Sequence, residues 1–169
     1  MTVAETSRLQ LRRFTGDDAA FVHALVNDPS WLAYIGDKGV RTLDDARRYL
    51  ENGPMAMYGK MGFGLYAATL KDTGTPIGMC GPIKRDTLDD VDLGFAFLPP
   101  YRGSGYALEA ASAVIAHARD DLGLTRIVAI VSPENERSIR LLERIGFRFE
   151  RAIDDAADNS VTLLYARPL

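Results

Sequence analysis

Polar and apolar side chains alternate along residues 8–12, near the start of the chain, and this pattern predicts a half-buried strand. After it, Thr15 has Asp18 three positions later, which is close to a capping box. Apolar residues then recur with helical spacing, so we expect a helix over residues 18–26. The chain therefore opens with a strand followed directly by a helix.

A second helix is predicted at residues 43–50, because Thr42 is a suitable N-cap and the apolar residues after it lie on one helical face. Residues 31–39 before this helix are rich in turn formers, and residues 52–62 after it contain several glycines and a proline. We expect both of these segments to be loops. Loops between helices often carry binding residues, so they are candidates for one wall of a substrate pocket.

Three strands follow, at residues 65–70, 77–83 and 91–98. They are separated by polar turns at residues 71–76 and 86–90. Short connections of this kind favour antiparallel pairing, so we expect a three-stranded meander.

The last part of the chain alternates helices and strands. An alanine-rich helix at residues 106–119 leads to a β-branched strand at 125–131, and a second helix at 135–145 precedes strands at 147–151 and 161–166. A strand–helix–strand unit implies one parallel pair with a right-handed crossover. The fold class is therefore α/β (α+β), with a mixed, mostly antiparallel central sheet and flanking helices.

Composition narrows the class of protein. The chain has 169 residues, which fits a single domain over residues 1–169, and its net charge of −3 is spread along the sequence, unlike a nucleic-acid-binding surface. It has one cysteine and two histidines, so we expect neither a disulfide nor a metal site. There is no membrane-length apolar run and no signal-peptide pattern, and we expect a soluble cytoplasmic protein.

The clearest candidate site lies where the third strand of the meander meets the helix that begins at Tyr106. The connecting segment contains Arg102, Gly103, Ser104 and Gly105. Glycines let the backbone approach a ligand, and the first N–H groups of a helix attract anions. The segment lacks the Gly-Lys-Ser/Thr of a Walker A loop and the third glycine of a dinucleotide fingerprint. We interpret it as a candidate pyrophosphate cradle.

Four stretches of the chain resemble the Gcn5-related N-acetyltransferase (GNAT) superfamily, in the ribosomal-protein N-acetyltransferase (RimJ/RimL-like) branch. The first is SRLQLR at residues 7–12 with Asp18, and the second is GMCG at 78–81. The third runs from DLGF at 92–95 through RGSGYALEA at 102–110. The fourth runs from VSPENERS at 131–138 to ERIGF at 143–147. Their order and spacing span nearly the whole chain.

The resemblance implies a GNAT fold with one parallel, splayed strand pair, and acetyl-CoA as co-substrate. It implies that strand residues Phe95, Ala96, Phe97 and Leu98 pair with the pantetheine arm, and that the N–H near Phe97 or Leu98 faces the thioester carbonyl. Arg102, Gly103, Ser104, Gly105, Tyr106 and Ala107 would hold the pyrophosphate. Asn135 would contact the pantetheine side, and Ser138 would protonate the departing thiolate.

The reaction implied is direct attack of an amine on the acetyl group within a ternary complex. Asp92 is the candidate general base, directly or through a bound water, and an α-amine with a pKa of about 7.7–8.0 needs less help than lysine. Glu109 is assigned a packing or capping part, and Cys80, in an apolar strand, is interpreted as a buried inert thiol.

Two other functions stay open at this stage. The fold could bind acetyl-CoA without catalysis, as a sensor or partner subunit, or it could use a longer acyl-CoA. The acceptor is an amine on a protein N-terminus or a small molecule, and residues 31–39, 52–62 and 154–160 are the expected walls of its site. Acidic residues at positions 28, 37, 44 and 45 suggest a cationic acceptor, or else a solvated surface. A monomer and a homodimer are both compatible with the sequence.

Overall fold

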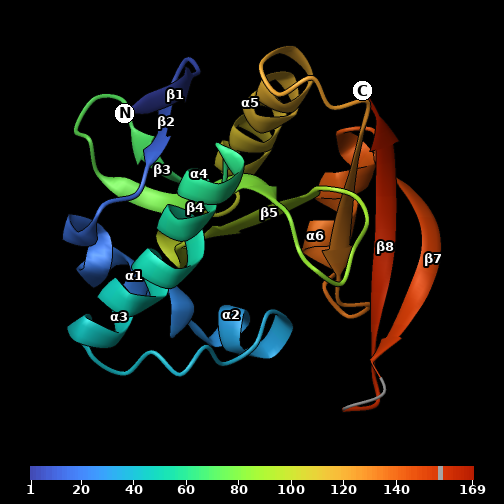
Figure 1. Cartoon of the computed structure of the whole chain (residues 1–169), viewed down its shortest axis with the longest axis horizontal. Coiled ribbons are helices and arrows are strands. Elements are labelled where there is room, and N and C mark those ends of the chain that lie inside the picture. The colour runs from blue at the N-terminus through green and yellow to red at the C-terminus, as the bar shows by residue number, and fades with distance from the viewer. Residues whose placement is uncertain (156–157) are drawn as a thin grey trace.

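The computed structural model describes residues 1–155 and 158–169 of the chain and has one central sheet (Figure 1). The strands lie side by side in the order β1-β2-β3-β4-β5-β6-β8-β7. Neighbouring strands are antiparallel except for β5 and β6, which are parallel. The strands are β1 (Thr2–Glu5), β2 (Leu9–Arg13), β3 (Tyr66–Leu70), β4 (Pro76–Ile83), β5 (Asp92–Phe97), β6 (Arg126–Val131), β7 (Arg148–Asp155) and β8 (Ser160–Pro168). The mixed, mostly antiparallel sheet expected from the sequence is confirmed.

The helices cover both faces of this sheet. They are α1 (Ala19–Val26), α2 (Pro29–Tyr34), α3 (Leu43–Leu50), α4 (Ala56–Met61), α5 (Tyr106–Asp120) and α6 (Glu136–Arg144), with a π-helical turn at Glu51–Met55 between α3 and α4. Figure 1 shows α1 and α3 at the left, α2 to the right of α3, and α6 beside β8 at the right.

The predicted helix starts are confirmed at the level of single side chains. Thr15 and Asp18 form a complete capping box, as do Thr42 and Asp45 at the start of α3. Gly105 precedes α5 with a φ of +85°, in the left-handed region that favours glycine. These local signals need only neighbouring residues, so the sequence contained them in full.

Alternation along the strands decides which helices pack on which face. In β3 and β4, Tyr66, Ala68 and Cys80 pack with α5, whereas Ala67 and Met79 pack with α1 and α3. The same alternation continues along β5, where odd-numbered side chains lie on the α5 face and even-numbered ones on the α1–α3 face. Asp92 is even-numbered, so its carboxylate is on the side of α1, α2 and α3.

The sheet opens between β5 and β6. These two strands share a single register pair, Asp92 with Val128, and their contact is made by the Val128 N–H, which donates to the Val91 carbonyl at 3.0 Å. By contrast, β6 pairs with β8 over six residues, from Arg126 to Val131. The splayed parallel pair therefore leaves part of the β5 edge without a strand partner.

Two segments that were expected to be loops contain helices, and strand β1 was not predicted. Residues 29–34 form α2, which begins with Asp28 accepting a hydrogen bond from the Ser30 N–H and with Pro29 at the first helical position. Residues 51–61 are helical too, although Gly53 and Pro54 favour a loop by composition. The wider π turn at this point tolerates the missing N–H of Pro54. Residues 154–160, which were expected to form a wall of the acceptor site, include residues 156 and 157, which lie outside the described residues.

Candidate active site

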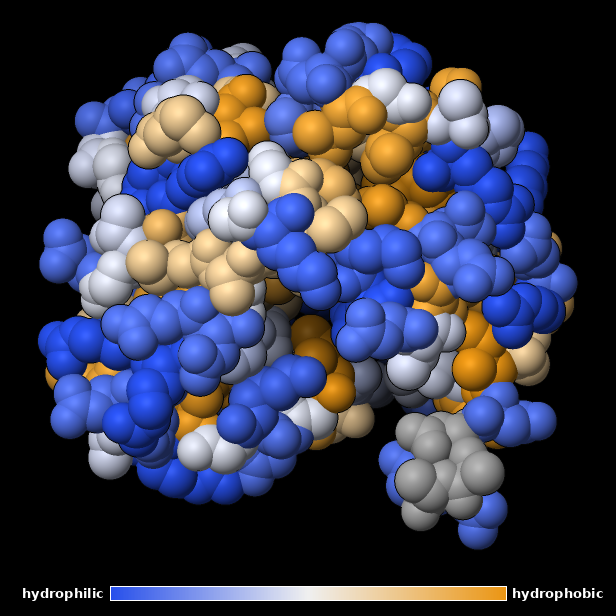
Figure 2. Space-filling model, in the orientation of Figure 1, coloured by the Kyte–Doolittle hydropathy of each residue, from blue (hydrophilic) through white to orange (hydrophobic). Residues whose placement is uncertain are grey.

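A cavity of about 580 Å³ lies beside the splayed strands. One wall comes from α2, α3 and the segment between them, including Trp31 and Tyr49, and the opposite wall comes from β6 and α6, including Ser132 and Ser138. Residues 92–95 of β5 form the strand side between the two walls. The face drawn in Figure 2 is hollowed near its centre, with hydrophobic residues recessed in the hollow. This volume is in the range that small-molecule sites have.

Asp92 is the buried carboxylate of this cavity, with a side chain only 1% exposed. Its Oδ1 accepts a hydrogen bond from the Arg85 Nε at 3.0 Å, and its Oδ2 has no partner among the described residues. Burial raises the pKa of Asp92, and the nearby Arg85 opposes this only in part. A carboxylate in this environment binds a proton more readily than an ordinary aspartate.

The exposed edge of β5 carries the backbone donors of the site. The Leu98 N–H donates to the Ile77 carbonyl at 2.9 Å, so even-numbered residues of β5 direct their N–H groups toward β4. Phe95 and Phe97 consequently direct theirs to the other edge, where β6 diverges. Of the two expected donors to the thioester carbonyl, Leu98 is engaged in the sheet and Phe97 lies on the open edge.

A glycine in β4 sets the position of the Phe97 ring. Gly78 lies opposite Phe97, and a Cβ at Gly78 would be 2.3 Å from that ring. The absence of a side chain lets the ring pack flat against β4, on the α5 face of the sheet. This packing keeps the ring away from the open edge of β5.

The glycine loop has the geometry of an anion cradle. Gly103 and Gly105 have φ values of +82° and +85°, and the loop leads into the N-terminus of α5. Arg8 lies against this loop: its guanidinium stacks on the Tyr106 ring at 4.2 Å, and its Nη2 would be 3.3 Å from a Cβ at Gly105. The sequence does not indicate that Arg8 lies at the loop, because Arg8 belongs to the connection between β1 and β2, 97 positions before Gly105.

The guanidinium of Arg102 is hydrogen-bonded within the fold. Its Nε donates to the Phe97 carbonyl at 3.0 Å, its Nη1 to the Ser30 Oγ at 2.9 Å and its Nη2 to Asp28 at 2.8 Å. Burial by itself would raise the pKa of Asp28, but the hydrogen bonds from Arg102 and Ser30 outweigh burial and lower it. Arg102 thus joins the end of β5 to the start of α2.

Arg102→Ala should lower the free energy of unfolding by about 2–3 kcal/mol, since it leaves the nearly buried Asp28 without its cation. Urea denaturation at pH 7 measures this. Because the pKa of Asp28 is lowered on folding, the pair stabilises the protein above the ordinary aspartate pKa, and this contribution disappears as the pH falls through the lowered value. The control is Arg47→Ala, at the exposed pair with Asp44, which should cost less than about 1 kcal/mol. Equal losses of unfolding free energy in the two variants would contradict a stabilising role of the Arg102–Asp28 pair.

Asn135 and Ser138 lie together at the start of α6, on the cavity wall. Asn135 is the N-cap, and its Oδ1 accepts from the Ser138 backbone N–H at 3.3 Å. The structure therefore brings Asp92, from β5, and Asn135 and Ser138, from the start of α6, to one cavity. Residues 102–107 follow the end of β5 and do not line this cavity.

Cys80 and Glu109 both contribute to the packing and hydrogen bonding of the fold and not to the cavity. Cys80 is fully buried in β4, and burial raises the pKa of its thiol, which keeps it protonated. Glu109 accepts hydrogen bonds from the Thr6 hydroxyl and from the Arg8 N–H and Nε, so it ties α5 to the β1–β2 hairpin. Neither residue lines the cavity, which agrees with the parts that the sequence assigned to them.

Cys80→Ala should leave the rate of acetyl transfer within about twofold of the wild type, and should cost about 1 kcal/mol of stability from the lost packing. Initial-rate kinetics with both substrates varied, together with thermal melting, measures the two effects. Loss of activity without unfolding would instead favour a covalent route through the thiol.

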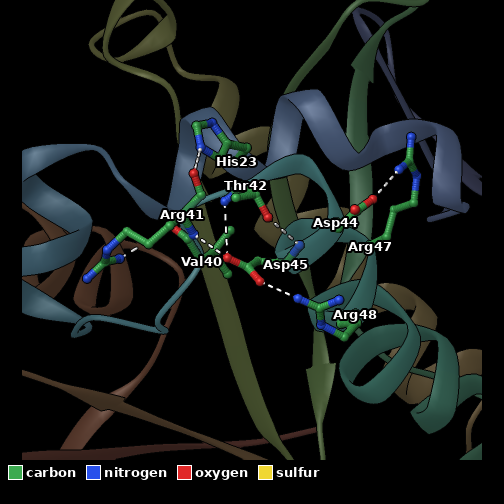
Figure 3. Close-up of polar contacts among 8 residues, drawn as sticks. All are labelled: His23, Val40, Arg41, Thr42, Asp44, Asp45, Arg47 and Arg48. Atoms are coloured by element: carbon green, nitrogen blue, oxygen red, sulfur yellow. Dashed lines mark hydrogen bonds and ion pairs between the residues drawn. The ribbon is translucent and has the colours of Figure 1, made fainter.

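The acidic residues that suggested a cationic acceptor are neutralised within the fold. Asp44 pairs with Arg47, and Asp45 accepts from the Arg41 and Thr42 N–H groups and pairs with Arg48 (Figure 3). Asp37 pairs with Arg41 and Asp28 with Arg102. His23 contacts the Arg41 carbonyl at 3.0 Å, so it serves the same local structure. Asp37, Asp44 and Asp45 therefore belong to an ion-paired surface, whereas Asp28 is buried and pairs with Arg102.

Trp31 and Lys38 line the cavity and belong to residues 31–39, which were expected to form a wall of the acceptor site. Tyr49 and Arg85 also line it, although they lie outside the segments that were expected to form its walls. No sequence pattern distinguishes Lys38 and Arg85 from the other basic residues of the chain. They reach the cavity because the α2–α3 segment and the β4–β5 connection meet there.

A splayed parallel strand pair, a free strand edge and a glycine loop before a helix together define an acetyltransferase fold. The chain belongs to the acetyltransferase (GNAT) family: the model of the "Acetyltransferase (GNAT) domain" matches residues 8–148. Proteins of this family use acetyl-CoA as co-substrate. The family expected from the sequence is therefore confirmed.

Similar proteins agree with this assignment. The chain is 31% identical over 145 residues to the uncharacterized N-acetyltransferase YnaD of Bacillus subtilis, covering 86% of this chain and 82% of that protein. It is similar to the crystal structure of a GNAT-family acetyltransferase from Bacillus anthracis, with 28% identity, a TM-score of 0.81 and coverage of 99% and 98%. The CoA complex of RimL, a ribosomal L7/L12 α-N-protein acetyltransferase, has a TM-score of 0.85 at 17% identity, with coverage of 100% and 98%, and so shares the fold.

Within the described residues, no group of three or more histidine, cysteine or acidic side chains is placed to hold a metal ion. The same residues include no helix that is both long enough and apolar enough to span a membrane.

Proposed function

We propose that this protein is an N-acetyltransferase that moves the acetyl group of acetyl-CoA to a primary amine by direct attack in a ternary complex. The observation that carries the proposal is the open edge of β5, next to a cavity whose wall holds the buried Asp92: the N–H of Phe95 lies at this cavity, and that of Phe97 lies two residues further along. Donor and base therefore lie along one strand. The amine is an α-amine of a peptide or of a small molecule.

The residues present fit acetyl-CoA, because the free N–H groups of β5 suit the amides of an extended arm and the glycine loop suits a pyrophosphate. When bound, this co-substrate supplies the activated acetyl group. The backbone of residues 103–107 holds its phosphates, with Arg102 fixing the loop to α2 and with the Nη2 of Arg8, whose Nε pairs with Glu109, close to Gly105. The Phe97 N–H stabilises the negative charge that develops on the acetyl oxygen.

Asp92 removes the proton that an ammonium must lose before it can attack. Its Oδ2 is the oxygen without a partner among the described residues, and its raised pKa brings its basicity closer to that of an amine. Because Asp92 is nearly inaccessible, the proton reaches it through a water in the cavity. This arrangement suits an α-amine, whose pKa is about 7.7–8.0, better than a lysine, whose pKa is about 10.4.

Ser138, on the cavity wall formed by β6 and α6, protonates the CoA thiolate when it leaves. Its hydroxyl is on the first turn of α6, and its backbone N–H is held separately by Asn135. The cap therefore orients α6 without using the hydroxyl. Asn135 also faces the cavity and contacts the pantetheine side.

Ser138→Ala should lower kcat by about 10-fold to 100-fold, near the lower end of what a general acid contributes, because a thiolate leaves readily. The Tm should stay unchanged, since the Asn135 cap uses the backbone of residue 138 and not its side chain. Steady-state rates from thiol release measure the effect. A variant with full kcat would assign the hydroxyl to structure alone.

The proposed function is tested by titrating the purified protein with acetyl-CoA and with CoA in a calorimeter, followed by thiol release with a panel of amines. Binding with amine-dependent thiol release is expected. Binding without release toward any amine would instead indicate a non-catalytic sensor, and faster turnover with a longer acyl-CoA would indicate a different acyl donor. Absence of binding would overturn the transferase proposal.

A further inference from the structure

Arg85 presents a cation to the cavity while it holds Asp92. Its Nε donates to the Asp92 Oδ1 at 3.0 Å, and 39% of its side chain remains exposed. No hydrogen bond from its Nη1 or Nη2 is present among residues 1–155 and 158–169. The outer end of the guanidinium is therefore available to a ligand beside the base.

Lys38 adds a second cation to the same wall. It lines the cavity with Arg85, although it comes from the segment between α2 and α3 and Arg85 from the β4–β5 connection. Desolvation and the neighbouring Arg85 charge both lower the pKa of the Lys38 ammonium, and no carboxylate in the described chain opposes them. Two like charges brought together in this way are stabilised by an anion between them.

The uncharged polar groups of this wall are donors as well. Trp31 is 5% exposed, and its indole Nε1 has no hydrogen-bond partner among the described residues. Tyr49 lies beside them, and burial raises the pKa of its phenol, which stays protonated. Lysine, arginine and tryptophan side chains donate hydrogen bonds and accept none. The complement of such a wall is a group that only accepts, such as a carboxylate.

The negative charges of the cavity offset these cations only in part. Asp92 pairs with Arg85, which leaves the charge of Lys38 without a carboxylate partner among the described residues. Asp158 belongs to the β7–β8 turn on the other side of the cavity, where its Oδ1 accepts from the Ser160 N–H at 2.9 Å. The wall formed by Lys38 and Arg85 thus keeps a positive charge facing the place where the acceptor must lie to reach Asp92.

We propose that the acceptor is an amine that also carries a carboxylate a few bonds away, and that Lys38 and Arg85 bind this carboxylate while the amine lies toward Asp92. The inference rests on the proposed transfer reaction and specifies its substrate class. Arg85 joins the two subsites, because one end of its guanidinium contacts the base and the other faces the cavity. The carboxylate belongs to a free amino acid or to the second residue of an acidic peptide.

The first test compares matched acceptors in a thiol-release assay with saturating acetyl-CoA. Free L-amino acids are compared with their α-carboxamides, and dipeptide amides with Asp or Glu second are compared with those carrying Asn or Gln. Within at least one of these series, kcat/KM should be at least about tenfold higher for the charged member. The series that responds identifies the source of the carboxylate. Equal rates or a preference for the uncharged members in both series would overturn the inference while leaving the transferase function intact.

The matched variants are Lys38→Glu, Lys38→Arg and Lys60→Glu. Lys60 is exposed on α4 and does not line the cavity, so Lys60→Glu changes the net charge equally without changing the site. Lys38→Glu should reduce the charge preference at least about tenfold through KM, Lys38→Arg should retain it, and Lys60→Glu should equal the wild type. An unchanged preference in a folded Lys38→Glu variant would overturn the inference.

A second test does not depend on turnover. The chain contains one tryptophan, Trp31, and it lines the cavity, so its fluorescence reports binding at this wall. N-acetyl-L-alanine and N-acetyl-L-alaninamide serve as probes that differ in charge. The carboxylate should bind at least about tenfold more tightly to the wild type, and this difference should be lost in Lys38→Glu. Equal binding of both probes would contradict the carboxylate subsite even if acetyl transfer is observed, and absence of transfer with a retained difference would contradict only the proposed reaction.

Discussion

Asp92→Asn should reduce kcat for acetyl transfer by at least about 100-fold, with acetyl-CoA affinity unchanged. The amide keeps an oxygen to accept from the Arg85 Nε, so Arg85 stays in place and the loss reports the base alone. In the wild type, kcat/KM should rise with pH through a pKa above that of an ordinary aspartate, because burial raises the pKa of Asp92. Rates from pH 5 to 9 measure both effects.

The stability of Asp92→Asn is the control for this result, because the direction of its change with pH can be predicted. Between the ordinary aspartate pKa and the raised pKa of folded Asp92, the folded protein binds more protons than the unfolded chain. Stability of the wild type therefore falls as the pH rises through this window. Asp92→Asn removes the buried charge, so its Tm at pH 8 should equal or exceed that of the wild type, and the advantage should shrink at low pH. An Asp92→Asn variant that melts normally and retains full activity from pH 6 to 9 would show that Asp92 is not the base.

Gly105→Glu should weaken acetyl-CoA binding by at least about 100-fold in calorimetric titrations. Any side chain at a φ of +85° is strained by about 1–2 kcal/mol, and the new Cβ would lie 3.3 Å from the Arg8 Nη2. The added carboxylate also places negative charge at the N-terminus of α5, where we propose that the pyrophosphate binds. Three effects therefore act against the same ligand.

The matched control is Gly74→Glu. Gly74 lies in the turn between β3 and β4 with a φ of +74°, and a Cβ there would meet nothing within 4 Å. It should lower the Tm by a similar amount and leave acetyl-CoA affinity unchanged. If both variants bind acetyl-CoA as the wild type does, the glycine loop is not the phosphate site.

Much of the fold could be predicted from residues that are close in sequence. The capping pairs at Thr15 and Thr42, the alternation along β2 and the strand–helix–strand unit around α5 all have their causes within a few residues. The two helical segments predicted as loops show the limit of this approach. At Pro54, packing of the adjoining residues on the core outweighs the local preference against a helix.

The candidate site also has features that the sequence indicates and contacts that only the structure shows. Its residue types and order were readable from the motifs around Asp92, Gly105 and Ser138. The partners of these residues were not readable, because Arg102 pairs with Asp28, the N-cap of α2, which is 74 positions away. The choice between Phe97 and Leu98 likewise required the register of β5 on β4.

The sequence by itself determined most of the succession of helices and strands, the glycine loop and the family, because these are encoded by short-range patterns; β1, α2 and the helical segment at residues 51–61 were not among them. Only the tertiary structure decided which distant charges pair and which face the cavity. The Asp44–Arg47 and Asp45–Arg48 pairs form within one turn of α3, whereas the pairing of Asp28 with Arg102 and the position of Lys38 and Arg85 on the cavity wall with Asp92 depend on where distant segments meet.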